Sequence, residues 1–256
     1  MKLTINTSYP SNSSSQHLLI LVDSEQFQNA QTAYKINDFQ ASVEATQFKA
    51  AFNESLALIA KVPVQANSQL IGLGKAEELQ AAKLAKIAQS IIKASQKKFK
   101  QISVDISALP QDLHYLFALN LTQAAYAFDE YKSTKNDFVL EQIDLITVQS
   151  PLNEAQLNLI AAIEKGQNTA RDLGNRPGNI CFPEYLADQA VALAAEFPDV
   201  LKVTVLDEQQ IADLGMNAFL AVSKGSDRPG RIIIMEYQAH LEQAPVVLVG
   251  KGITFD

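Results

Sequence analysis

The final six residues of the sequence carry the side chains best suited to metal or phosphate chemistry. Lys251 lies between Gly250 and Gly252, and Asp256 follows at the end of the hexapeptide. A lysine here could pair with a phosphate, form a Schiff base or bind a metal through its neutral amine. The last role requires burial and a nearby cation to overcome an ordinary pKa of about 10.4. Asp256 offers the hard carboxylate oxygen that divalent cations prefer. Residue types alone also fit an ordinary loop.

The elements before the hexapeptide predict where it would lie. Strands are expected at 231–237 and 245–250, because the runs 232–235 and 246–249 within them are apolar without alternation, which is typical of strands that are covered on both faces. Ligands of open α/β sheets bind at the carboxyl ends of the strands. A strand ending at Gly250 would therefore place Lys251 in a crevice at that edge.

Short apolar runs alternate with long amphipathic stretches along the chain, which predicts an α/β fold with parallel strands covered by helices. Strands are expected at 17–22, 69–72, 102–106, 143–148 and 203–206, and helices at 44–61, 75–99, 113–131, 151–173, 183–197 and 209–214. Ser150 and Pro151 form a helix start signal, so a second unit is expected to begin there. The predicted domains are residues 1–149 and 150–256.

Composition excludes several classes of protein. The chain has 256 residues, of which 47% are hydrophobic and 19% charged, as in globular proteins. A net charge of −7 argues against non-specific nucleic-acid binding by the whole chain. A single cysteine, Cys181, excludes an internal disulfide and a cysteine-rich metal site. The apolar run 18–22 is too short to span a membrane and no signal peptide is recognisable, so we expect a soluble, cytoplasmic protein without a membrane partner.

The sequence 249–256, VGKGITFD, resembles the metal-binding signature of the leucyl aminopeptidases, the M17 family of cytosol aminopeptidases. Four further segments are similar to family segments and occur in the family's order. They are 125–133 at the end of the first domain, 168–179 and 183–187 at the opening of the catalytic domain, and 214–226 beyond them. Residues 1–120 match only in their β/α layout.

The resemblance implies a fold, an activity and a metal site. The fold is an N-terminal macro-like α/β domain followed by the opening part of an α/β metallopeptidase catalytic domain. The activity is removal of N-terminal residues, with leucine and other apolar residues preferred, from peptide substrates by a homohexamer. Two divalent ions per subunit, manganese or zinc, are expected, with Lys251 binding one ion and Asp256 bridging both. The family's catalytic lysine and arginine lie beyond Asp256, so no catalytic residue is assigned here, and the chain alone is expected to be inactive.

Two other binding sites are less favoured. The sequence Gly72-Leu73-Gly74 lies between a strand and a helix and could bind a phosphate group such as that of ADP-ribose, but it lacks a full dinucleotide or P-loop motif, which favours a tight turn. The lysine-rich stretch 75–100 could bind DNA, although a solvated helix face explains it better. A DNA-binding, regulatory or hexamer-assembly module is the alternative function.

The remaining candidates favour structural roles. His17, His114 and His240 have no metal-ligand spacing. Cys181 has no paired histidine motif and is expected to be a buried thiol that takes no part in catalysis.

Overall fold

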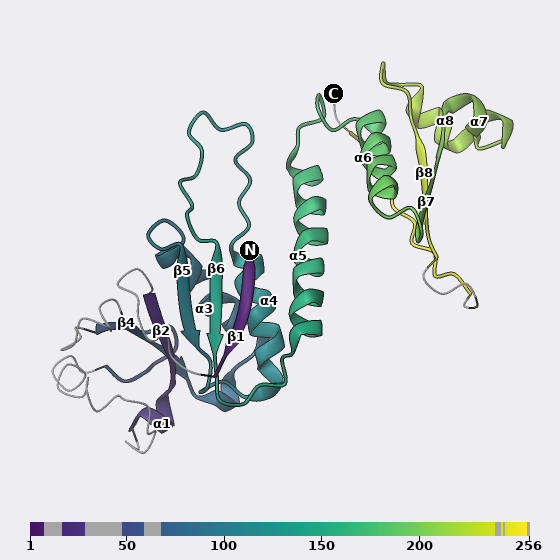
Figure 1. The fold of residues 1–256 in the computed structure, drawn as a ribbon. Helices are drawn as coiled ribbons and strands as arrows, with labels where there is room; N and C mark the ends of the chain where they lie inside the picture. The colour runs from purple at the N-terminus through teal and green to yellow at the C-terminus, as the bar shows by residue number, and fades with distance from the viewer. Residues whose placement is uncertain (8–16, 29–47, 59–67, 239–241, 243, 255–256) are drawn as a thin grey trace. The chain divides into compact units, whose positions relative to one another are not determined.

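The computed structural model describes residues 1–7, 17–28, 48–58, 68–238, 242 and 244–254. The chain divides into two compact units, Met1–Asn168 and Thr169–Asp256. Helix α5 (Glu154–Asn175) begins shortly after the predicted domain boundary at 149/150 and contains the division between the two units. Each unit is described by itself below (Figure 1).

The first unit contains a six-stranded sheet in the order β1-β6-β5-β2-β4-β3. All neighbouring strands are parallel except β3 and β4, which are antiparallel. The strands are β1 (Lys2–Asn6), β2 (His17–Asp23), β3 (Ser55–Leu58), β4 (Ser68–Gly74), β5 (Gln101–Asp105) and β6 (Gln142–Ile146). The predicted α/β class is thus confirmed, with β1 and β3 as strands that the sequence pattern did not reveal.

Helices α3 and α4 pack on this sheet because each has an apolar face. The helices of the first unit are α1 (Ser24–Gln28), α3 (Ala81–Ser95), α4 (His114–Ala124) and the greater part of α5, with 3₁₀ turns at Ala76–Glu78 and Gln111–Leu113. The predicted stripe on α3, from Leu84 to Ile92, is fully buried against the core. Each large aliphatic side chain so buried contributes about 1.5–3 kcal/mol.

The predicted helix at 44–61 is wrong where the structure describes it. Residues 48–54 form a tight loop, and β3 (Ser55–Leu58) pairs antiparallel with β4. Phe48 is buried and its ring lies edge-on to Phe27, with ring centroids 5.2 Å apart. The helical spacing of Phe48, Phe52 and Leu56 is overridden because pairing with β4 satisfies the backbone of this segment. Residues 29–47 and 59–67 lie outside the described residues.

The second unit contains a two-stranded antiparallel sheet, β7 (Leu201–Leu206) and β8 (Ile232–Tyr237). Helix α6 (Pro183–Glu196) contacts both strands, and the short helices α7 (Glu208–Asp213) and α8 (Asn217–Ser223) contact each other. The sequence predicted both the proline in the first turn of α6 and the interruption between α5 and α6. The predicted helix at 209–214 corresponds to α7, whereas α8 was not predicted.

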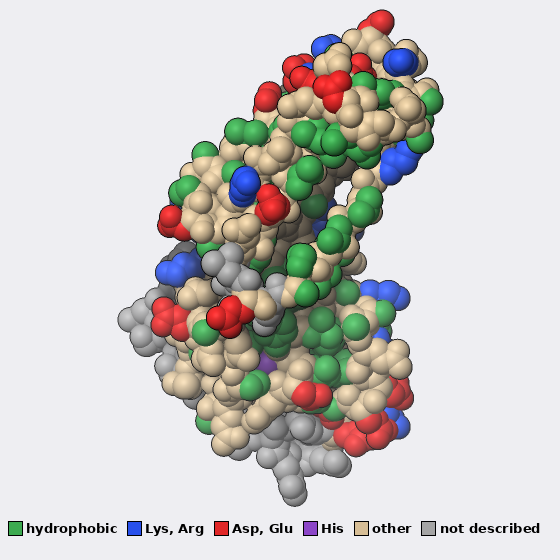
Figure 2. Space-filling model, turned by 90° about the vertical axis from the view of Figure 1, so that its right-hand side faces the viewer, with side chains coloured by type: hydrophobic (Ala, Val, Ile, Leu, Met, Phe, Trp, Pro, Cys, Tyr) green, Lys and Arg blue, Asp and Glu red, His purple; other side chains and the backbone are tan. Residues whose placement is uncertain are grey.

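The expected strand at 245–250 is wrong. Residues 244–254 form neither helix nor strand, and the side chains from Val246 to Val249 are 75–92% exposed. Residues 234–237 of β8 are also exposed, although the sequence of this strand predicted cover on both faces. A strand needs a hydrogen-bonded neighbour, and β8 pairs only with β7 among the described residues. Figure 2 shows hydrophobic side chains spread over the exposed surface. No described helix is long and apolar enough to cross a bilayer.

Candidate functional site

Lys251 and its flanking glycines lie in the segment 244–254 and are exposed. A Cβ atom added to Gly250 or Gly252 would meet no atom within 4 Å, so local packing of the described residues does not explain either glycine. Asp256 lies outside the described residues. The structure therefore places one of the two predicted metal ligands, and the described residues do not supply the burial that favours a neutral lysine amine.

The described residues contain no group of three histidine, cysteine, aspartate or glutamate side chains that could hold a metal ion. The ring of His17 stacks on Phe99, with centroids 4.6 Å apart, and His114 is buried between two loops. His240 lies outside the described residues.

The segment 168–187, which carries part of the family resemblance, contains the end of α5, a turn and the start of α6. Helix α5 ends at Asn175, and the backbone N–H groups of Ile180 and Cys181 donate to the Pro177 carbonyl at 2.9 and 2.8 Å. The thiol of Cys181 is buried, and desolvation raises its pKa, with nearby Arg176 opposing the shift. The predicted burial of this thiol is confirmed, and a protonated thiol is a poor nucleophile.

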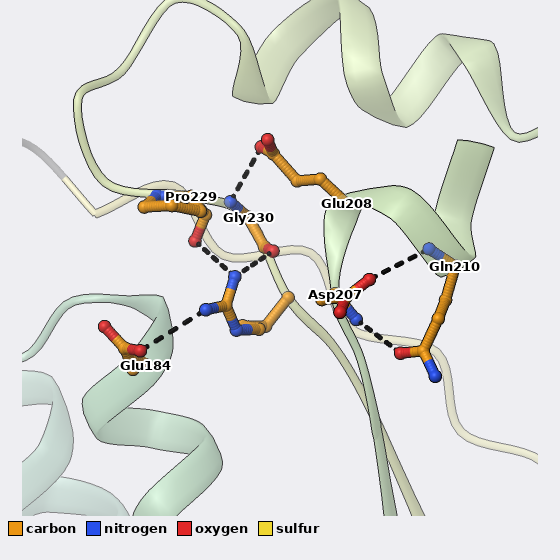
Figure 3. A network of polar contacts seen from close by, with 7 residues as sticks. Glu184, Asp207, Glu208, Gln210, Pro229 and Gly230 are labelled. Carbon is orange, nitrogen blue, oxygen red and sulfur yellow. Dashed lines mark hydrogen bonds and ion pairs between the residues drawn. The ribbon is translucent and has the colours of Figure 1, made fainter.

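A polar network in the second unit was not predicted as a site (Figure 3). The guanidinium of Arg231 donates to the carbonyls of Gly230 at 3.0 Å and Pro229 at 3.4 Å, and to the Glu184 carboxylate at 3.3 Å. The Glu208 carboxylate accepts from the Gly230 N–H at 3.0 Å. These bonds connect α6, α7 and the start of β8, which gives the network a structural role.

Asp207 begins α7 with a capping box. Its side chain accepts from the Gln210 N–H, and the Gln210 side chain accepts from the Asp207 N–H, both at 2.9 Å. The spacing of Asp207 and Gln210 could have identified this helix start from the sequence.

Substitution Glu208→Gln should destabilise the second unit in a pH-dependent way. The Gly230 N–H chiefly, then Ser223, Arg231 and Lys224, lower the pKa of Glu208. Because the folded pKa lies below the unfolded one, the stability from the carboxylate is present above the unfolded pKa, about 4.3, and is lost as the pH falls further. Urea unfolding at pH 7 and pH 3 should show a larger difference between the two proteins at pH 7 than at pH 3. An equal difference at both pH values would contradict this role of the charge.

The Gly72-Leu73-Gly74 sequence is explained by packing. A Cβ on Gly72 would lie 2.1 Å from the Ala51 carbonyl oxygen, and Gly74 has a φ of +72°. The nearby Ala76 N–H, which could face an anion, already donates to the Asp23 carboxylate at 2.7 Å. A second carboxylate oxygen of Asp23 accepts from the Glu25 N–H at 2.9 Å. A negatively charged group at this position argues against a phosphate ligand.

The lysine-rich stretch 75–100 is partly neutralised by acidic residues. Lys83 pairs with Glu78 at 3.1 Å, and Lys97 pairs with Asp137 at 2.6 Å. Lys86 and Lys93 are exposed on α3. The carboxylates paired with Lys83 and Lys97 weaken the attraction of this stretch for a DNA phosphate backbone. This supports the interpretation of the stretch as a solvated face.

Comparison with curated proteins gives long matches at high identity. The chain is 67% identical over 256 residues to the "Probable cytosol aminopeptidase" of Acinetobacter baumannii strain SDF, covering 100% of this chain and 53% of that protein. Identity to the protein of the same name from Pseudomonas aeruginosa strain LESB58 is 41% over 203 residues, covering 73% of this chain and 40% of that protein. The chain spans about half the length of the curated relatives it matches.

Comparison with solved structures supports the same fold. A mutant of tomato leucine aminopeptidase superposes with a TM-score of 0.75 at 19% identity, covering 91% of this chain and 50% of that chain. The bottromycin maturation enzyme BotP in complex with Mn gives a TM-score of 0.67 at 20% identity, covering 87% of this chain and 45% of that chain.

Two family models match in sequence order. The cytosol aminopeptidase family N-terminal domain matches residues 20–135, and the catalytic domain of the same family matches residues 168–256. The second match contains the segment 249–256, which carries the resemblance to the family's metal-binding signature. Together with the relatives described above, these matches show that the chain belongs to the cytosol aminopeptidase family.

Proposed function

We propose that this chain forms part of a metal-dependent aminopeptidase that releases N-terminal residues, preferably leucine and other apolar residues, from peptides. The observation that carries the proposal is the match of residues 168–256 to the catalytic domain of the cytosol aminopeptidase family. The identity of 67% to the Acinetobacter baumannii relative, across the whole chain, supports the same activity.

We further propose that Lys251 and Asp256 are metal ligands of a site for two divalent ions, manganese or zinc. A neutral amine and a carboxylate are suitable donors for such ions. The structure of the bottromycin maturation enzyme, described as a complex with Mn, supports a metal requirement in a protein of this fold. When bound, a pair of metal ions supplies an activated water molecule and polarises the scissile carbonyl.

The role of Lys251 in this proposal sets a requirement on its surroundings. The Lys251 amine must lose a proton to coordinate an ion. In the working enzyme, this exposed side chain must therefore become buried or lie next to a metal cation. Lys251 and Asp256 act as ligands, and no described side chain is assigned to proton transfer.

The 256-residue chain by itself should not hydrolyse leucine p-nitroanilide. One lysine and one carboxylate cannot satisfy two divalent ions, and the described residues contain no three-ligand cluster of histidine, cysteine or carboxylate groups. The measurement is release of nitroaniline with added Mn²⁺ or Zn²⁺. The matched control is a chimeric enzyme in which these 256 residues replace the segment that they match in the Acinetobacter baumannii relative. Turnover by the purified chain that a chelator abolishes would refute the prediction.

Family membership also motivates proposals on assembly and location. We propose that the working enzyme is a homohexamer in the cytoplasm. The alternative of a DNA-binding, regulatory or assembly module gains no support from the lysine-rich stretch 75–100, because Lys83 and Lys97 are paired with acidic residues.

A further inference from the structure

His114 is a buried histidine whose ring joins two loops of the first unit. It is 1% exposed and occupies the first position of α4. Its Nε2 atom lies 3.0 Å from the Leu109 carbonyl oxygen, and its Nδ1 atom lies 3.2 Å from the Ser150 hydroxyl. Because a carbonyl only accepts hydrogen bonds, Nε2 carries the proton in the neutral ring and Nδ1 accepts from Ser150.

Ser150 belongs to the connector 147–153, which leads from β6 to α5. Its hydroxyl oxygen also accepts the Leu152 N–H at 3.1 Å, and the Leu152 side chain is buried. The contact of Gln111 with Gln149, at 3.3 Å, is exposed to solvent. The His114–Ser150 contact is therefore a part-buried link between this connector and the first residue of α4.

The surroundings of His114 oppose its positive charge. Burial is the main cause that lowers its pKa, and the carbonyls of Leu109 and Ile106 and the Asp112 carboxylate oppose this shift. Among the described residues, the charged side chain that acts on the ring is the Asp112 carboxylate. The positive end of the α4 dipole further disfavours an imidazolium at the first helical position.

We propose that the His114–Ser150 contact is a pH-sensitive attachment that holds the connector 147–153 when His114 is neutral and releases it when His114 is protonated. A protonated Nδ1 no longer accepts a hydrogen bond. The Ser150 O–H group must then turn away from the ring, and its proton loses Nδ1 as its acceptor. Protonation also places a positive charge on a buried ring, which is costly. Opening of the connector removes this cost because water can then hydrate the ring. Release of the connector loosens the beginning of α5.

The direction of the pH effect follows from proton linkage. The open state binds a proton near the ordinary histidine pKa of about 6.5, whereas the closed state binds it only at lower pH. The attachment is therefore complete above pH 6.5 and weakens as the pH falls below that value. At low pH, the equilibrium constant for opening increases by up to about tenfold for each pH unit by which the pKa of His114 is lower in the closed state than in the open state.

Hydrogen exchange on the full 256-residue chain tests this proposal. Protection of amides 150–153, corrected for the intrinsic pH dependence of exchange, should fall as the pH is lowered from 7.5 to 5. Substitution His114→Gln should remove this pH dependence, and Ser150→Ala should lower protection already at pH 7.5. A His17→Gln control should retain the wild-type pH dependence.

A second measurement keeps the test decisive if the His114 variant does not fold. The NMR titration midpoint of the His114 ring in the unaltered chain should lie below 6.5. An ordinary midpoint, pH-independent protection of the connector, or an unchanged pH effect in His114→Gln would each overturn the proposal. None of these results depends on aminopeptidase activity.

Discussion

Substitution Asp256→Ala should reduce kcat of the chimeric enzyme by about two to three orders of magnitude. Removing a carboxylate that bridges two ions forfeits several kcal/mol of transition-state stabilisation. A loss of about 3–4 kcal/mol corresponds to this factor, because each 1.36 kcal/mol is a tenfold change in rate. The measurement is steady-state hydrolysis of leucine p-nitroanilide at saturating Mn²⁺, with metal content determined on the same samples.

The matched control for this prediction is Asp199→Ala, which alters an exposed carboxylate outside the 249–256 segment. It should leave kcat within about twofold of the parent enzyme, as expected for an isolated surface position. Retention of full activity and metal content by Asp256→Ala would exclude Asp256 as a ligand. A metal content that is unchanged while kcat falls would instead assign Asp256 a role other than binding the ions.

Substitution Gly72→Ala should destabilise the first unit by about 3 kcal/mol or more. The new methyl group would lie 2.1 Å from the Ala51 carbonyl oxygen, which is a backbone atom and cannot rotate away. Overpacking of this kind typically costs about 1–3 kcal/mol, and here the displaced loop would also lose its hydrogen bonds to β4. These bonds include Gly72 N–H to the Glu54 carbonyl at 2.8 Å and Gly74 N–H to the Ala50 carbonyl at 3.1 Å.

Thermal unfolding should detect this change as a drop in Tm of about 6–12 °C, at about 2–4 °C for each kcal/mol in a domain of this size. Gly166→Ala is the control, because a Cβ there meets no atom within 4 Å and alanine favours the α5 helix. It should leave Tm unchanged or raise it. Equal behaviour of the two variants would show that the 48–54 loop is not packed closely on β4.

Local patterns predicted the elements whose stability is decided locally. The apolar stripe of α3 is buried as its spacing predicted, because amphipathic periodicity directly determines which face meets a core. The proline at the start of α6 also marked a real helix boundary. The alternation of these helices with apolar runs was sufficient to predict a mainly parallel α/β sheet.

The errors concern segments whose structure depends on distant partners. The spacing of Phe48, Phe52 and Leu56 suits a helix, but the edge of β4 recruits this segment as loop and strand. The apolar run 245–250 resembles a buried strand, yet no described strand pairs with it. Sequence alone does not reveal which strand edge is available for pairing. A strand was therefore missed at residues 55–58, and a strand was wrongly predicted at residues 245–250.

The candidate site was identified by resemblance to a family rather than by geometry. Lys251 and Asp256 stand out only within the octapeptide 249–256, since a lysine between two glycines is otherwise an ordinary turn. The structural network around Glu208 and Arg231 escaped prediction because its residues come from three separate elements. Only the capping box of Asp207 and Gln210 had a local signal.

Anomalous X-ray scattering from Mn²⁺-loaded crystals of the chimeric enzyme tests the assignment of Lys251 and Asp256 most directly. We expect two manganese peaks close together, with the Lys251 amine bound to one ion and the Asp256 carboxylate bound to both, at distances of about 2.0–2.3 Å. Manganese peaks that are coordinated entirely by other groups, with neither side chain in contact with an ion, would contradict the account.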